Sequence, residues 1–98
     1  MTQFITGIAW YDEKQWEKMR ACSVDKDQLH ETYSDWLVEA EKTFKGMARE
    51  GITVKKVYVD VDQLQAWAGK QMLPINGRSR AGFAQYLVSS QAALTGHT

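Results

Sequence analysis

The sequence has little cysteine, little proline, no long apolar run and no net charge. Its single cysteine, Cys22, cannot form an internal disulfide, and a lone thiol excludes the paired-cysteine zinc patterns and the C-x-x-C redox pairs. No stretch approaches the roughly 18 consecutive apolar residues of a membrane-spanning helix, and the first residues lack the features of a secretory signal. We therefore expect a protein of the cytoplasm that has no membrane contact.

The acidic and basic residues are equal in number but unevenly placed. Residues 1–50 carry ten acidic and seven basic side chains, whereas no acidic residue follows Asp62. The last third therefore contains only the cations Lys70, Arg78 and Arg80. Because the formal net charge is zero, the chain as a whole has no electrostatic attraction for nucleic acid. We rank nucleic-acid binding through the acid-free last third below the other functions considered.

Apolar and aromatic residues are plentiful. The hydrophobic share is 44%, the aromatic share is 11%, and the chain contains four tryptophans. A disordered chain has few aromatics, and a chain of 98 residues is long enough to bury a core of its own. We expect one domain over residues 1–98, with a frayed tail at 95–98.

Helix starts are indicated by aspartates that precede a glutamine by three residues, as in a capping box. This spacing predicts helices that start near Asp12, Asp25 and Asp62. The second helix is expected over residues 25–50 and to end at Gly51. Its apolar residues recur with the 3.6-residue period of a core-facing helix. They are Leu29, Tyr33, Trp36, Leu37, Ala40, Phe44, Met47 and Ala48.

Two segments rich in β-branched and aromatic residues, 53–59 and 4–10, predict strands. A last helix is expected after the loop that contains Pro74. The predicted fold class is α+β, with about four amphipathic helices packed on a minimal two-stranded sheet in the order β-α-α-β-α-α. Because an isolated two-stranded sheet is marginally stable, either helices cover it or a second chain completes it.

The start of the last helix is the best candidate for a small-molecule site. A helix N-terminus offers free amides and a positive dipole, and arginines add fixed charge, so a phosphate or a carboxylate would fit. An ordinary surface turn before a helix has the same pattern. The anion-binding candidates are Asn76, Gly77, Arg78, Ser79 and Arg80.

Two carboxylates, Asp60 and Asp62, flank Val61 at the end of the second predicted strand. Alternate residues of an extended segment point to the same face, so the pair could share a magnesium ion. A helix cap at Asp62 explains the same residues, and no third acidic ligand follows. We favour the cap, and the sequence indicates no metal and no cofactor.

Four carboxylates recur at every fourth position of the second predicted helix and would form an acidic ridge. They are Asp27, Glu31, Asp35 and Glu39. A solvated helix face is the alternative. A two-fold axis would place each ridge against Lys70, Arg78 and Arg80 of another copy, so we predict a homodimer. A monomer results if the charges pair within one chain or if the helices cover the sheet.

Three local patterns resemble those of small uncharacterised bacterial proteins, and the resemblance implies no activity. The patterns are Trp10-Tyr11 with Trp16, residues 59–64 with Trp67, and Leu73-Pro74 with Asn76-Gly77 and Arg80.

Three functions are open from the sequence. The first is a non-enzymatic interaction or regulatory module, which we favour because every catalytic pattern has a structural explanation. The second is a phosphate- or metal-dependent enzyme or ligand-binding protein that uses Asp60, Asp62, Arg78 and Arg80. The third is a weak nucleic-acid binder.

Overall fold

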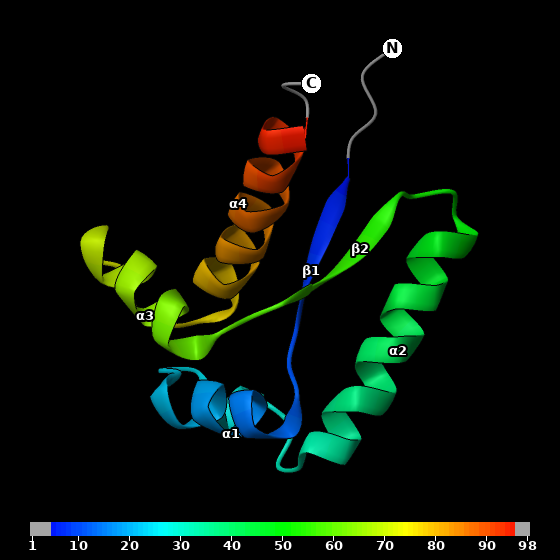
Figure 1. The fold of residues 1–98 in the computed structure, drawn as a ribbon. Coiled ribbons are helices and arrows are strands. Elements are labelled where there is room, and N and C mark those ends of the chain that lie inside the picture. Colours follow the sequence, from blue (N-terminus) through cyan, green and yellow to red (C-terminus); the bar gives the residue numbers. More distant parts are fainter. Residues whose placement is uncertain (1–4, 96–98) are drawn as a thin grey trace.

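The computed structural model describes residues 5–95, which form four α-helices and two strands in the predicted order β-α-α-β-α-α. The elements are β1 (Thr6–Trp10), α1 (Glu13–Cys22), α2 (Tyr33–Arg49), β2 (Val54–Tyr58), α3 (Val61–Lys70) and α4 (Gly77–Thr95). Figure 1 shows α4 and α2 on opposite sides of the strands. The predicted α+β class is confirmed. Of the expected tail at 95–98, residues 96–98 lie outside the described residues, as does Phe4 of the first predicted strand.

The two strands pair in parallel and form a two-stranded sheet. Thr6 lies beside Val54, and Trp10 lies beside Tyr58. One 2.9 Å hydrogen bond runs from the Val59 amide to the carbonyl of Trp10, just beyond the end of β2. Both strands are therefore edge strands, and each has an outer edge that the other strand does not cover.

The outer edge of β1 is covered by a side chain of α4. The amide of Gly7 donates to Gln85 Oε1 at 3.1 Å, and Gln85 Nε2 donates to the carbonyl of Ile5 at 3.0 Å. In a parallel sheet, the N–H and C=O groups of one residue of a neighbouring strand would make these two bonds. The Gln85 carboxamide thus takes the place of a third strand and blocks pairing along this edge.

Helix α4 lies unusually close to β1 because residue 7 is glycine. A Cβ atom at Gly7 would lie 2.6 Å from Cγ2 of Val88, 3.0 Å from the carbonyl oxygen of Ala84 and 3.1 Å from Cγ2 of Val57. Val57, Ala84 and Val88 are buried and form a small core between the sheet and α4. A side chain at position 7 would separate the helix from the strand.

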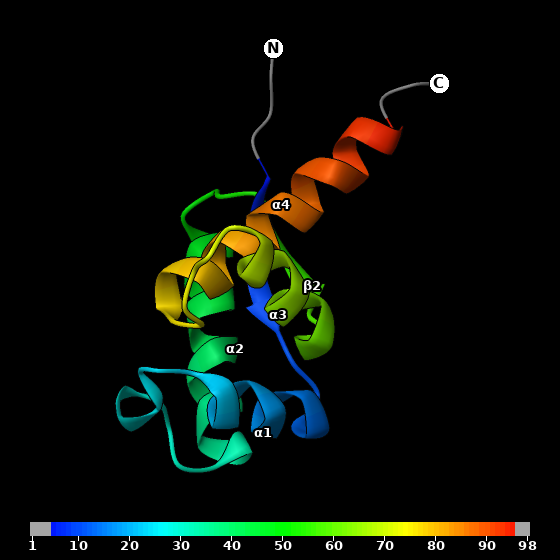
Figure 2. The ribbon, with the colours of Figure 1, turned by 90° about the vertical axis from the view of Figure 1, so that its left-hand side faces the viewer.

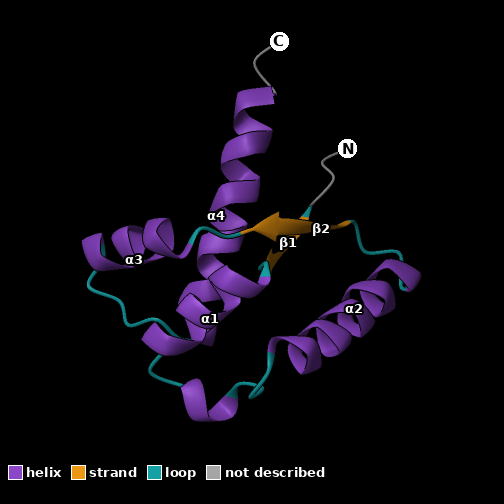
Figure 3. Cartoon of the chain, turned by 60° about the horizontal axis from the view of Figure 1, so that its bottom comes forward, coloured by secondary structure: helices purple, strands orange, loops and turns teal. Residues whose placement is uncertain are grey.

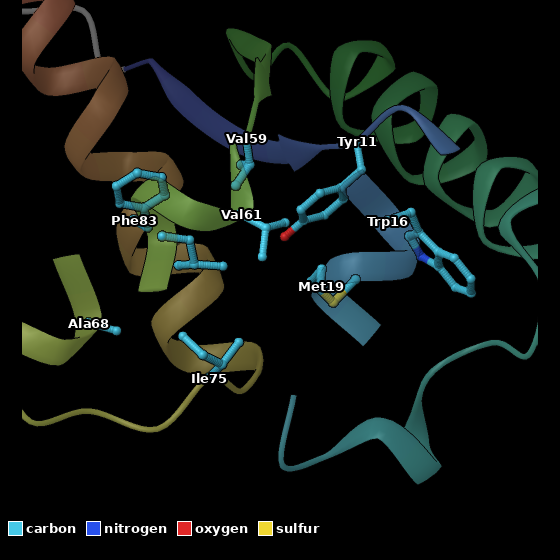
Figure 4. Close-up of a cluster of buried hydrophobic side chains, with 9 residues drawn as sticks. Tyr11, Trp16, Met19, Val59, Val61, Ala68, Ile75 and Phe83 are labelled. Atoms are coloured by element: carbon cyan, nitrogen blue, oxygen red, sulfur yellow. The ribbon is translucent and has the colours of Figure 1, made fainter. Parts of the chain in front are cut away.

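The main core lies beyond the carboxyl ends of the strands, among α1, α3 and α4 (Figure 4). Tyr11, which directly follows β1, points into it together with Met19 of α1 and Val61 of α3. Met19 and Val61 are each 1% exposed, and Leu64 of α3 is fully buried. The short helices α1 and α3 are therefore held mainly by burial of apolar side chains.

Of the predicted helix caps, the one at Asp12 is confirmed and the one at Asp62 is wrong. Asp12 caps α1 as predicted, since its side chain accepts from the Gln15 amide at 2.8 Å. Helix α3 is capped by Asp60 and not by Asp62, because Asp60 accepts from the Gln63 amide at 3.1 Å. The helix therefore starts two residues earlier than predicted, with Val61 as its first residue, and the side chain of Val61 is buried.

Helix α2 starts at Tyr33, so the predicted start near Asp25 is wrong. Thr32 caps the helix, and its hydroxyl accepts from the Asp35 amide at 3.2 Å. Residues 26–28 form only a short 3₁₀ turn. Tertiary bonds hold the segment before α2 in its place: the Val24 amide donates to the carbonyl of Ile75 at 2.9 Å, and Arg20 donates to the carbonyl of His30 at 3.0 Å.

Although α2 has the predicted apolar stripe, none of its residues is buried. Its aromatic side chains make edge contacts with β1, and the ring centroid of Trp10 lies 5.4 Å from that of Trp36 and 6.2 Å from that of Phe44. Figure 3 shows α2 set apart from the group formed by α1, α3 and α4. The stripe is therefore only half covered by the rest of the described chain.

Candidate interaction surfaces

The predicted anion-binding residues mostly build the start of α4. Asn76 Oδ1 accepts from the Ser79 amide at 3.0 Å, and Ser79 Oγ accepts from the Asn76 amide at 3.0 Å and donates to the carbonyl of Pro74 at 2.7 Å. Ser79 is 5% exposed. This reciprocal cap satisfies two amides of the first turn and fixes the direction of the preceding loop.

A carboxylate of the chain itself lies at this helix N-terminus. Asp25 Oδ2 accepts from the Gly77 amide at 3.1 Å and from Arg80 Nη2 at 2.9 Å, and Asp25 Oδ1 accepts from Arg80 Nη1 at 2.8 Å. Arg80 Nη1 also donates to Ser23 Oγ at 2.9 Å. Figure 2 shows the start of α4 above the segment that follows α1. The structure thus brings Gly77 and Arg80 together around Asp25.

This ion pair shifts the ionisation of Asp25. The hydrogen bonds from Arg80 lower the pKa of the Asp25 carboxyl below its ordinary value. The side chain of Arg80 is 11% exposed and that of Asp25 is 19% exposed, so water screens the pair weakly. Its structural effect is to fasten the segment after α1 to α4.

Arg78 lies apart from this ion pair, on the rim of a hollow between α3 and α4. We name the hollow the α3–α4 groove, and its volume is about 590 Å³. It is lined by Trp67, Leu73, Pro74, Asn76, Arg78, Ser79 and Gly82. Beside it, Met72 is 92% exposed with a φ of 58°, and Tyr86 is 50% exposed. The groove therefore combines apolar and aromatic walls with one exposed guanidinium.

The predicted acidic ridge is divided among three segments, because α2 starts at Tyr33. Asp27 lies in the 3₁₀ turn, Glu31 lies in the loop before α2, and only Asp35 and Glu39 are on the helix. All four side chains are exposed. No contact in the described residues joins them to Lys70, which is exposed at the end of α3.

The aspartates considered for a metal site point to different partners. Asp60 caps α3, and Asp62 pairs with Lys18 of α1 at 3.1 Å. Within residues 5–95, no group of three or more histidine, cysteine, aspartate or glutamate side chains is placed to hold a metal ion.

Burial raises the pKa of the Cys22 thiol, which donates to the carbonyl of Met19 at 3.4 Å.

The outer edge of β2 is a further candidate surface, and the sequence patterns do not indicate it. Alternate residues of a strand direct their N–H and C=O groups to opposite sides. The bonded register therefore directs those of Val54, Lys56 and Tyr58 away from β1. Figure 1 looks onto this edge, where β2 crosses in front of β1. Within the described residues no other strand pairs with β2.

The side chain of Lys56 lies on the face of the sheet that α2 covers, away from the outer edge of β2. Lys56 Nζ lies 2.9 Å from Glu41 Oε1 of α2, 4.2 Å from the ring centroid of Trp10 and 5.0 Å from that of Phe44. The charge is therefore paired and held over an aromatic ring of β1. Tyr58, by contrast, is 70% exposed beside the edge.

Within residues 5–95, no helix has the length and apolar character that a membrane span requires. No family model matches the sequence, and comparison with curated proteins and with solved structures finds no match.

Proposed function

We propose that the chain is a small non-enzymatic interaction module that acts as a homodimer in the cytoplasm. The observation that carries the proposal is the state of α2. Its 17 residues carry a pronounced apolar stripe, yet none of them is buried, and Val38 is 56% exposed. A helix of this pattern normally buries its apolar face, and uncovered apolar surface is typical of an interaction site.

The charged groups support the same proposal. Asp25 is paired with Arg80, Asp62 is paired with Lys18, and Asp60 caps α3. Each of these side chains therefore already has a partner within its own chain. The cytoplasmic location is supported by the single cysteine, Cys22, which leaves the chain without an internal disulfide.

Light scattering behind a sizing column tests the homodimer. We expect a mass of twice the 11.2 kDa of one chain at micromolar concentration. A mass of one chain throughout that range would contradict the proposal. Repeating the measurement at high salt tests the contribution of Lys70 and the acidic residues, because salt screens exposed charge pairs. If the mass is unchanged, apolar contacts hold the dimer.

The alternative function is ligand binding in the α3–α4 groove. Of the residues predicted for it, Arg78 lines the groove, whereas Arg80 is bonded to Asp25 and Asp60 caps α3. Melting the protein with inorganic phosphate, nucleotides or magnesium tests this alternative. A rise of several degrees that is lost in Arg78→Ala but kept in Lys70→Ala would favour it over the interaction module.

A further inference from the structure

We infer that the second copy docks along the outer edge of β2, so that two chains form one continuous four-stranded sheet in the order β1-β2-β2-β1. This inference rests on the proposed homodimer and names its interface. It follows from a difference between the two edges of the sheet, from the position of one lysine and from the self-complementarity of β2.

The two edges of the sheet differ in what covers them. At the edge of β1, Gln85 bonds to Ile5 and Gly7 and takes the place of a strand. At the edge of β2, the backbone groups of Val54, Lys56 and Tyr58 have no partner among residues 5–95. Proteins usually protect an exposed edge with a proline, a bulge, a charge or a covering element. The sequence of β2 contains neither proline nor glycine.

The charges on β2 do not oppose this pairing. In an antiparallel pair centred on a two-fold axis at Lys56, the two copies of that residue face each other. Each ammonium group is nevertheless bonded to Glu41 of its own chain and lies over Trp10 of β1, on the side away from the edge. Lys55 faces Val57 of the other copy in this register, so the exposed Lys55 side chains of the two copies are not opposite each other.

The same register is self-complementary. Val54 of one chain lies opposite Tyr58 of the other, and the two-fold axis repeats this pair. In each facing pair among Val54, Lys56 and Tyr58, the N–H of either residue donates to the C=O of the other, as in antiparallel neighbours. Tyr58, now 70% exposed, gains a β-branched neighbour, which is a favourable cross-strand combination.

The strand pair alone is too small for a stable dimer, because such interfaces bury about 1,200–2,000 Å² in total. Helix α2 contacts β2 on the face that carries Lys56, and its apolar residues are only half covered. The pairing brings the two copies of α2 to the same face of the joined sheet. We therefore assign the remaining buried area to the half-covered side of α2.

A proline at a β2 residue whose N–H points away from β1 distinguishes this interface from other dimer interfaces. Tyr58→Pro removes an N–H that points away from β1 and leaves the β1 ladder intact, as an edge proline does. Tyr58→Thr keeps the N–H and removes the ring, and Val54→Pro repeats the backbone test at the other end of β2. We expect both proline variants to raise the dissociation constant at least tenfold in light scattering over a dilution series, and Tyr58→Thr to raise it less.

Amide hydrogen exchange of the wild-type dimer, read by NMR, keeps the test valid if a proline variant fails to fold. We expect the amides of Val54, Lys56 and Tyr58 to be protected, and their protection to fall on dilution. A wild-type monomer overturns the proposed homodimer and this interface together. A dimer whose Lys56 amide exchanges freely, or that persists in a folded Tyr58→Pro variant, overturns only the interface. Protection that appears only with another protein bound also overturns it.

Discussion

Replacing Gly7 with alanine tests whether the close approach of α4 to β1 holds the sheet. The new Cβ atom would lie 2.6 Å from Val88 Cγ2 and 3.0 Å from the carbonyl oxygen of Ala84. The valine methyl can move, but the Ala84 oxygen belongs to the backbone of α4. The substitution therefore forces the helix away from the strand and strains the bonds of Gln85 to β1.

The magnitude follows from two opposing effects. Overpacking a well-packed core lowers the free energy of unfolding by about 1–3 kcal/mol. Alanine also restricts the unfolded chain, which raises the same quantity by about 0.4–1 kcal/mol. We expect a net loss of about 1–2 kcal/mol for Gly7→Ala. In the double variant with Val88→Ala the loss is smaller than the sum of the two single losses, because the closest clash is relieved.

Urea unfolding followed by tryptophan fluorescence at one fixed protein concentration measures these changes. Gly46→Ala is the matched control, since Gly46 lies in the last turn of α2 and a Cβ there meets nothing within 4 Å. The control should gain about 0.5–1 kcal/mol from helix propensity. A Gly7→Ala variant as stable as the wild type, or an additive double variant, would refute the role assigned to this contact.

Two further substitutions give pH-dependent outcomes. Asp25→Asn should lower the free energy of unfolding by about 1.5–3 kcal/mol. Asp62→Asn, which breaks an exposed pair, should lower it by only about 0–1 kcal/mol. Arg80 holds the folded pKa of Asp25 below its ordinary value of 3.8. The stabilisation from this pair is therefore lost as the pH falls below about 4. Urea titrations at several pH values should show this loss in the wild type and not in Asp25→Asn. Burial raises the pKa of Tyr11, and its buried hydroxyl has no partner among residues 5–95. Tyr11→Phe should therefore cost nothing at neutral pH and, in alkaline melts, reduce the loss of stability above about pH 10.

Features that depend on local chemistry were predictable from the sequence. The cap at Asp12 and the change to β-branched residues after Gly51 are encoded by residues a few positions apart, and both correctly place α1 and β2. The element order follows from the same signals. The choice between Asp60 and Asp62 as a cap is not local, because both have a glutamine three residues later. Burial of Val61 in the core decides between them.

Features that depend on distant partners were not predictable. Asp25 has the local pattern of a cap, but its carboxylate bonds to Arg80, which lies 55 residues away. The predicted start of α2 is too early for the same reason, since tertiary bonds hold the preceding segment. In the predicted anion site, the sequence located the start of α4 but gave no sign that Asp25 lies there.

The cover of β1 by Gln85 has no sequence signal either. A glutamine on a helix is an ordinary residue, and its two bonds to β1 form only when α4 lies against Gly7. The apolar stripe of α2 was predicted correctly, but the pattern does not say how much of the stripe the rest of the chain covers. The open edge of β2 and the half-covered α2 thus became visible only in the fold.

The central claim is that a second copy completes the two-stranded sheet. Isotope-filtered NMR on an equal mixture of labelled and unlabelled chains tests it most directly, because only contacts between chains give signals. The account predicts nuclear Overhauser effects between the methyl groups of Val54 in one chain and the ring of Tyr58 in the other. A dimer whose interchain signals arise only from other residues, or a mixture that gives none at millimolar concentration, would contradict it.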